Sequence, residues 1–342
     1  MNRSIFIFTI LVFLFNCPRF SMGQYVEDRI VVAQYGEGIY SILERNELEP
    51  SKYLANFIEL NLQKLAKDST LIAGQIYTLP EPLLDKKLPV ENPALKGNQI
   101  YFGEKYSPLK LKDSLLNDAV YYLVSGHGGP DPGAIGHYKN QLVSEDEYSY
   151  DVTLRLAKNL LEQGAKVYMI VQDADDGIRD DDILLLDKDE TTYPGLKMPI
   201  NQRARLMQRT ESINKLYHEN LSGYQRLVVI HIDSRSEGEN IDVFFYHHHR
   251  SKNGEKLATE IQQVIKSKYA RYQPNRNYYG TVSSRSNLFL VKNTFPPMVY
   301  IELGNIKNKK DQRRFILSDN RQALANWMTE GIINDYKNAS KK

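Results

Sequence analysis

Cysteine is almost absent from the 342-residue sequence, with Cys17 as its single occurrence. One cysteine cannot form an internal disulfide, which excludes a small disulfide-stapled scaffold. An excess of charge of one sign is also missing, because 44 Lys and Arg stand against 42 Asp and Glu, and nothing in this balance indicates binding to nucleic acid or a membrane surface. Stability and chemistry must therefore come from core packing, from oxygen and nitrogen groups, or from a metal.

Long hydrophobic runs are missing as well, except close to the start. After Arg3, the run IFIFTILVFLF has the length of a signal-peptide core but is too short for a membrane anchor. A possible cleavage site before Gln24 is preceded by small residues at its positions minus three and minus one. We expect a cleaved signal peptide over residues 1–23 and an exported protein of the periplasm or cell envelope. The alternative is a lipoprotein anchored through Cys17, although the asparagine before it fits that signal poorly.

Residues 29–80 predict the order strand, helix, helix, strand. RIVVAQ and AGQIYTLP are the strand candidates, and apolar residues recur at helical spacing in GEGIYSILERN and YLANFIELN. The pattern resembles a divergent LysM domain, with Gly36 to Leu43 as its first turn and helix and Asn61 as its asparagine. The resemblance implies binding of glycans that contain N-acetylglucosamine, as in peptidoglycan or chitin. The alternative is a small βααβ unit that only packs on its neighbour. Residues 81–117, without sustained periodicity, predict a linker and an approach strand.

From residue 118 on, apolar runs of strand length alternate with helical stretches. The expected strands are DAVYYLVSG, AKVYMIVQD, RLVVIHID, IDVFFYHH, NLFLVKN and PMVYIELGN. The expected helices are YSYDVTLRLAKNLLEQG, NQRARLMQRTESINKLYHE, GEKLATEIQQVIKSKY and NRQALANWMTEGIINDYK. This alternation predicts an α/β fold, a mixed and mostly parallel sheet with helices on both faces. In such sheets, functional sites gather at the carboxyl ends of the strands.

Three of these strands end in groups that can bind a metal or move a proton. YYLVSGHGG ends near His127, LVVIHID ends with His231 and Asp233, and MVYIELGN carries Glu302 near its end. An unpaired carboxylate is costly to bury beside apolar residues unless a metal or an exchanged proton accompanies it. Two histidines and a carboxylate, with water in the fourth position, make a catalytic zinc site in which the pKa of the water falls to about 7. The three strand ends therefore predict such a site.

These motifs together resemble zinc-dependent N-acetylmuramoyl-L-alanine amidases of the amidase-3 family. The resemblance is carried, in order, by HGGPDPGAIG, by Arg209 and Asn214 in RTESIN, by VIHID, by PPMVYIELGNIKNKKD and by ALANWMTEGI. It implies a zinc amidase fold and a catalytic domain over residues 118–337. It also implies one zinc ion as cofactor and peptidoglycan as substrate. The expected reaction is hydrolysis of the amide between the lactyl group of N-acetylmuramic acid and the L-alanine of the stem peptide.

Matching residue by residue, the resemblance makes His127 and His231 zinc ligands and Glu302 the catalytic glutamate. Arg209 also matches the family pattern. An arginine on a helix is more often a surface or structural ion-pair residue than a substrate contact. We therefore assign Arg209 no catalytic role.

The third zinc ligand in the family is a glutamate that opens the helix after the glycine corner. Alignment on LRLA at 154–157 places Glu145 in this position, and helical spacing puts it on the apolar face of the predicted helix. Its neighbours Asp146 and Glu147 stay open as alternatives. Ser144 and Glu147 have the spacing of a capping box, which would account for Glu147 without a metal.

The sequence departs from the family pattern at several places. A threonine-arginine pair is replaced by Val171 and Gln172, and an asparagine near the second histidine by Asp233. Residues 173–200 form an insertion whose first part, DADDGIRDDDILLLDKDE, is acidic and fails the calcium-loop spacing. We expect a solvated surface loop or a lid there, and a lid could block the cleft until a protein activator moves it.

Two other functions remain as alternatives. One is a catalytically inactive wall-binding protein that keeps a degenerate amidase fold, which the departures favour and the retained His127, Glu145, His231 and Glu302 oppose. The other is a zinc peptidase that acts on stem peptides.

Overall fold

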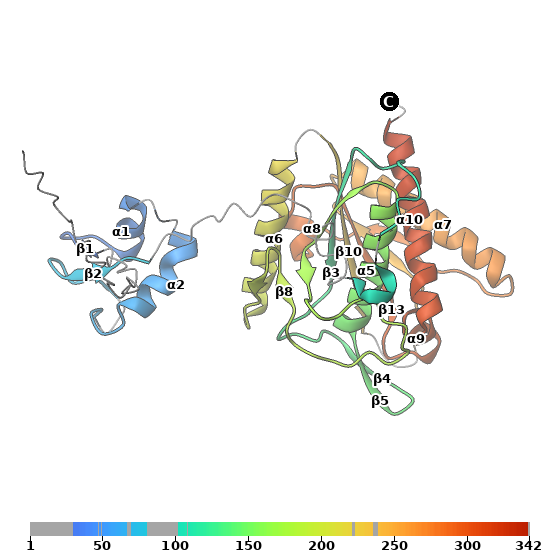
Figure 1. Ribbon diagram of the computed structural model, residues 1–342, viewed down its shortest axis with the longest axis horizontal. Coiled ribbons are helices and arrows are strands. Elements are labelled where there is room, and N and C mark those ends of the chain that lie inside the picture. Colours follow the sequence, from blue (N-terminus) through green and yellow to red (C-terminus); the bar gives the residue numbers. More distant parts are fainter. Residues whose placement is uncertain are drawn as a thin grey trace, which may run out of the picture. The chain divides into compact units, whose positions relative to one another are not determined.

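The computed structural model describes residues 30–46, 48, 50–66, 70–80, 102–107, 109–220, 223–234 and 239–340 (Figure 1). The expected signal peptide and Cys17 lie outside these residues, as do residues 81–101 and 108 of the expected linker. The chain divides into two compact units, Met1–Pro89 and Val90–Lys342. No helix within the described ranges is long and apolar enough to cross a membrane.

The first unit has the expected order of elements, and its two strands close on each other. It contains β1 (Ile30–Val32), α1 (Ile39–Arg45), α2 (Pro50–Leu60) and β2 (Ile76–Thr78), and β1 pairs with β2 in antiparallel register. Its own apolar core includes Ile42, Leu43, Phe57 and Tyr77, all fully buried. The buried Asn61 amide donates to the carbonyls of Phe57 and Thr78, at 2.8 Å each, and accepts from Thr78 N at 2.8 Å. Asn61 therefore fastens the end of α2 to β2.

The second unit is built on a six-stranded sheet of order β12-β11-β13-β10-β3-β6. These strands are β3 (Ala119–Ser125), β6 (Lys166–Met169), β10 (Tyr224–Asp233), β11 (Phe244–His247), β12 (Val282–Ser284) and β13 (Met298–Asn305). All neighbours pair in parallel except β11 and β13, which are antiparallel. The expected mixed, mostly parallel sheet is confirmed.

Helices cover both faces of this sheet (Figure 1). They are α5 (Glu145–Glu162), α6 (Gln202–Glu219), α7 (Lys252–Tyr272), α8 (Phe289–Asn293), α9 (Lys309–Ile316) and α10 (Ser318–Ser340). On one face, α10 packs against both α5 and α7, whereas α6 packs against α8. Adjacent residues of β3 point to opposite faces, and Tyr122 donates its hydroxyl to Leu216 O on α6, at 3.1 Å. The other face receives Tyr121, whose ring packs against Tyr224.

One expected strand is wrong, and another is not found among the described residues. The run NLFLVKN forms the short helix α8, where consecutive residues Leu290 and Val291 are both buried. Short apolar runs do not distinguish a buried strand from a buried helical turn by periodicity. The approach strand expected within residues 81–117 is not found in residues 102–107 or 109–117, which contain the 3-10 turn η1 (Glu104–Tyr106), and the rest of that range lies outside the described residues. Phe102 and Leu116 are fully buried in the core of the second unit.

Smaller elements were not predicted at all. They are a hairpin of β4 (Ile135–Tyr138) and β5 (Gln141–Ser144), the short strands β8 (Thr191–Thr192) and β9 (Leu196–Lys197), and the edge strand β12. The strands β8 and β9 form a three-stranded sheet with β7 (Val171–Gln172), which is the end of the expected strand AKVYMIVQD. The hairpin joins the glycine corner after β3 to the start of α5. It therefore sets where α5 begins relative to β3.

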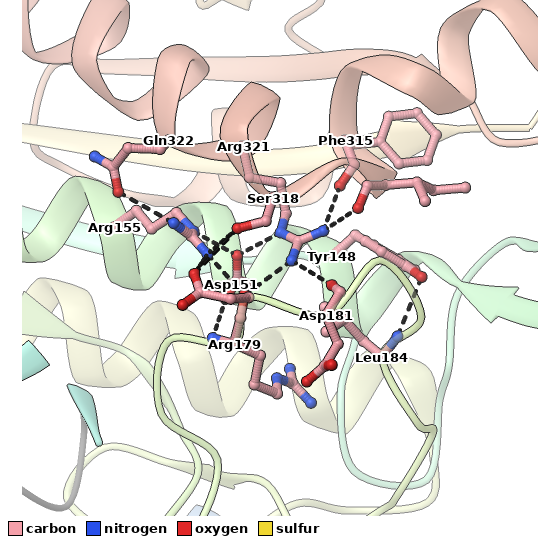
Figure 2. Close-up of polar contacts among 12 residues, drawn as sticks. Tyr148, Asp151, Arg155, Arg179, Asp181, Leu184, Phe315, Ser318, Arg321 and Gln322 are labelled. Atoms are coloured by element: carbon pink, nitrogen blue, oxygen red, sulfur yellow. Dashed lines mark hydrogen bonds and ion pairs between the residues drawn. The ribbon is translucent and has the colours of Figure 1, made fainter. Parts of the chain in front are cut away.

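A buried ion network holds the acidic insertion against α5 and α10. Figure 2 shows Arg155 and Arg321 converging on Asp151, whose Oδ2 accepts from their Nε atoms at 2.7 and 2.6 Å. All three residues are buried. Both guanidinium groups also donate to the main-chain carbonyl of Arg179, and Arg321 donates to that of Asp181. The main chain of this surface stretch is therefore fixed to the core at Arg179 and Asp181.

Removal of the Asp151 carboxylate should destabilise the second unit strongly. Asp151→Ala removes the anion that the two buried guanidinium groups share, and losing one partner of a buried ion pair costs about 3–5 kcal/mol. Arg155 keeps only the longer contact with Asp180, at 3.4 Å. Denaturant unfolding measures the change. Asp118→Ala, at an exposed site of the same unit, should change the free energy of unfolding by less than about 0.5 kcal/mol. A loss below about 1 kcal/mol for Asp151→Ala would contradict the prediction.

Candidate metal centre

His127 lies in a sharp corner just after β3. Its backbone has φ 59°, in the left-handed region, and Gly128 and Gly133 follow with φ 101° and 70°. Such angles are rare for residues with a side chain, so the glycines permit a turn that most residues would resist. A β-carbon at Gly133 would lie 2.7 Å from both Glu145 Oε2 and His127 Cδ2. The corner is thus shaped closely around these two side chains.

Glu145, the first residue of α5, lies between the two histidines. Its Oε2 is 3.2 Å from His127 Nε2, and its Oε1 is 2.7 Å from His231 Nδ1. The backbone N–H groups of Ala134 and Ile232 donate to the same two oxygens, at 2.9 and 3.0 Å. The carboxylate therefore contacts two histidines and two backbone N–H groups, and the residue is only 4% exposed.

The two alternatives for the third ligand point elsewhere. Glu147 accepts from Arg179 Nη1 at 2.8 Å and from Asp187 N at 3.0 Å. Asp146, Glu147 and Glu190 form a separate buried group, in which burial, with the charges of the two glutamates, raises the pKa of Asp146 to about 8. The expected capping box is wrong, since Ser144 is the N-cap but makes no side-chain cap hydrogen bond. Glu147 binds the distant Arg179 instead of capping the helix with Ser144.

Glu302 lies beside His231 on the neighbouring strand. The two residues are in register in the parallel pair of β10 and β13, so their side chains point to the same face of the sheet. Tyr300, two residues earlier on that face, stacks on the His231 ring with centroids 4.5 Å apart and an interplanar angle of 14°. Glu302 thus stands next to the histidine pair, and Tyr300 fixes the plane of one of the rings.

The charges at the site favour an ionised Glu145. Burial alone would raise the pKa of Glu145, but the contacts with His231 and His127 outweigh burial and lower it. Burial lowers the pKa of His231. For His127, burial acts in the same direction, yet the bond to Asp131 and the charge of Glu145 raise its pKa overall. A carboxylate anion beside a neutral histidine is the form of these groups that binds a metal.

The donor set fits a zinc ion. Each of His127, Glu145 and His231 offers one ligand atom, and the three atoms lie within 4.8 Å of one another. Two imidazole nitrogens and one carboxylate oxygen are the ligands of many catalytic zinc sites, which leave a fourth position open. The structure therefore brings together all three residues that the sequence predicted as ligands.

A family model described as N-acetylmuramoyl-L-alanine amidase matches residues 122–334, which is more than half of the chain. The chain belongs to this amidase family. It is therefore a hydrolase of peptidoglycan that acts on the amide between N-acetylmuramic acid and L-alanine. Zinc dependence is general in the family, and its members act on the cell wall, at the envelope or outside the cell.

The individual relatives are similar to this amidase at low sequence identity. The germination-specific N-acetylmuramoyl-L-alanine amidase of Bacillus subtilis is 24% identical over 222 residues, covering 64% of this chain and 80% of that protein. The structure of the CwlD amidase from Clostridioides difficile, in complex with the GerS lipoprotein, is 21% identical with a TM-score of 0.48, over 65% of this chain and 100% of that one. Cwp6 from Clostridium difficile is 20% identical with a TM-score of 0.47, over 65% of this chain and only 30% of that one.

Two residues that were assigned no role at the zinc site from the sequence support His127 in this amidase. Asp131 Oδ2 lies 3.1 Å from His127 Nδ1 and accepts from Arg205 Nη2 at 2.5 Å. Arg209, buried on α6, donates to the main-chain carbonyl of His127. This is neither a substrate contact nor an ion pair, the two roles considered from the sequence. The available signals were the HGGPDPG motif, which contains Asp131, and the match of Arg209 to the family pattern.

Loss of the Asp131 carboxylate should weaken zinc binding by the amidase. Asp131 holds the imidazole nitrogen that faces away from Glu145, and removal of such a partner of a metal-binding histidine typically costs about 10–100-fold in metal affinity. Competition of Asp131→Ala with a fluorescent zinc chelator measures the change. Asp118→Ala is the matched control and should bind zinc like the parent. Equal affinity of Asp131→Ala and the parent would contradict this orienting role.

Proposed function

We propose that this protein cleaves the amide between the lactyl group of N-acetylmuramic acid and L-alanine with one zinc ion, held by His127, Glu145 and His231, and with Glu302 as the catalytic residue. The observation that carries the proposal is the position of Glu145. Its two oxygens lie 3.2 and 2.7 Å from His127 Nε2 and His231 Nδ1, at the carboxyl ends of two neighbouring strands. Parallel sheets place ligand sites at this edge.

Each residue has a separate task in the proposed reaction. When bound, zinc supplies an acidified water and polarises the carbonyl of the substrate. Glu302 accepts the proton of the attacking water and returns it to the departing L-alanine nitrogen. Tyr300 and Asp131 keep His231 and His127 in their orientations, through ring stacking and through the contact at Nδ1.

The first unit is proposed to bind the glycan strand of peptidoglycan. Its βααβ order and the closure by Asn61 support a LysM-like role. We further propose a signal peptide over residues 1–23 that is removed on export to the periplasm or envelope, with lipid attachment at Cys17 as the alternative. The mass of the mature protein separates the two.

A protein activator, which the sequence analysis left open, is proposed to act on the later part of the insertion. The stretch from Arg179 to Asp181 is fixed to buried arginines through its carbonyls. After it, Leu185 is 79% exposed and Ile200 is 87% exposed. Exposed apolar side chains suit contact with another protein.

Replacement of Glu302 should abolish turnover while zinc stays bound. Glu302→Gln keeps the shape of the side chain but cannot accept a proton, and we expect a fall in rate of at least about 100-fold. Mass spectrometry of digested sacculi gives the products. The matched control Glu211→Gln, at an exposed site of α6, should digest normally.

The same digests distinguish the alternative functions. Intact stem peptides with a new N-terminal L-alanine indicate an amidase, and shortened stems indicate a peptidase. An absence of products from the parent protein would indicate an inactive wall-binding protein. Native-rate digestion by Glu302→Gln would exclude Glu302 as the catalytic residue.

Removal of the Glu145 carboxylate should remove zinc. Glu145→Ala leaves two histidines as ligands, so we expect less than about one tenth of the parent's zinc content after dialysis. Elemental analysis of the purified proteins measures it. Asp146→Asn should keep its zinc, because Asp146 lies in a different carboxylate group. The reverse pattern, with zinc lost from Asp146→Asn and kept by Glu145→Ala, would assign the third ligand to Asp146.

A further inference from the structure

A cavity between the end of α7, α9 and the first half of α10 is lined by cations and aromatic rings. Its volume is about 540 Å³, which is within the usual range of a ligand pocket. The cationic lining residues are Arg276, Lys310, Arg313 and Arg314. Among the residues that the structure describes around the cavity, none is acidic and none belongs to the zinc centre. We call it the basic cavity.

Buried carboxylates balance two of the four cations. Asp242 pairs with Arg276, and its Oδ1 lies 3.2 Å from Arg314 Nη2. The same Arg314 nitrogen lies 3.2 Å from Asp311 Oδ1. Asp242 and Asp311 are 1% and 0% exposed, so both lie behind the cavity wall and not on its surface. They hold Arg276 and Arg314 in place and neutralise these two residues.

Lys310 and Arg313 have no such partner. Both are exposed, and neither side chain forms an ion pair or a hydrogen bond with the described residues. They belong to the basic stretch KNKKDQRR, residues 307–314, whose one acidic residue is the buried Asp311. The basic cavity therefore carries an excess of two positive charges. A hollow lined by one sign of charge attracts ligands of the opposite sign.

An aromatic wall gives the basic cavity a second chemical character. Trp327 lines it together with Tyr269, whose ring packs edge-on against the indole with centroids 5.7 Å apart. The Tyr269 hydroxyl accepts from the buried Arg314 Nε at 2.7 Å, so this wall is fixed in position. Aromatic rings pack on the CH groups of a sugar ring, and the amides of Gln273 and Asn320 in the same lining can bind hydroxyl groups. The lining suits a sugar that bears an anionic group.

Hydrolysis by this amidase generates a ligand of that kind. The bond between the lactyl carbonyl carbon and the L-alanine nitrogen breaks, the oxygen of water stays on the lactyl carbon, and the nitrogen leaves with a proton as an amine. The resulting lactyl acid is ionised at neutral pH, so each stripped N-acetylmuramic acid carries a carboxylate. In the uncut strand the same group is a neutral amide. A charged lactyl group on the sugar therefore occurs only in the product.

We propose that the basic cavity binds glycan strands from which the stem peptides have been removed. Lys310 and Arg313 contact the lactyl carboxylate, to which a guanidinium group can donate two parallel hydrogen bonds, and Trp327 packs on the sugar ring. The inference rests on the proposed reaction, because that reaction supplies the carboxylate. Binding there keeps the protein on a strand that it has processed, close to the stems that remain.

The test is titration of the zinc-loaded, full-length protein with soluble glycan strands that a different N-acetylmuramoyl-L-alanine amidase has stripped. Trp327 is the single tryptophan of the chain, so its fluorescence reports the basic cavity and not the first unit. We expect a saturable change in emission. The double substitution Lys310→Gln with Arg313→Gln should weaken binding at least about 10-fold, because hydrogen bonds from charged donors are lost. The matched control, Arg203→Gln with Lys215→Gln at exposed sites of α6, removes the same charge and should bind like the parent.

Strands whose lactyl carboxylates have been converted to methyl amides test the charge without changing the protein. They should bind the parent at least about 10-fold more weakly. An absence of any emission change, or equal binding of the amide strands or of the doubly substituted protein, would overturn the proposal. Displacement of the strands by inorganic polyphosphate at equal charge concentration would overturn the assignment to a carboxylated sugar.

The strands are stripped beforehand, so this experiment does not depend on turnover by the protein itself. Digestion of sacculi without binding to the stripped strands would contradict only the basic cavity as a product site. Binding without digestion would contradict only the proposed reaction.

Discussion

The carboxylate of Glu145 is the contact on which the arrangement of the site depends. It touches a histidine from each of two neighbouring strand ends and accepts backbone N–H groups from the chain after each of them. A carboxylate in this position needs a helix that begins at a defined place, and the β4–β5 hairpin supplies it by bringing the chain directly from the corner to α5. The glycine at 133 is required because any larger residue would displace either Glu145 or His127.

Much of this arrangement could be predicted from the sequence, for a physical reason. Parallel strands end at one edge of the sheet, so polar residues that follow apolar runs, such as His231, come together there. Helical periodicity identified α5, α6, α7 and α10 correctly. It could not identify α8, because NLFLVKN is only about two turns long and is buried on more than one side.

Other contacts between distant segments could not be predicted from the sequence. The Ser144–Glu147 pair has the spacing of a capping box, yet Glu147 binds Arg179, 32 residues away. Arg209 was assigned to the surface or to an ion pair because that is where arginines on helices usually lie, whereas it is buried and bonds a main-chain carbonyl. In each case the local pattern describes a tendency, and a partner from a distant part of the chain decided the contact that forms.

The anchoring of the acidic segment has a consequence for how this part of the chain can evolve. Arg321 binds the segment through the carbonyl oxygens of Arg179 and Asp181, and every residue type has such an oxygen. Side-chain substitutions at Asp181 therefore leave the anchor intact, provided that the backbone keeps its path. The attachment is made by Arg321 on α10, while the outward side chains of the segment can change without affecting it.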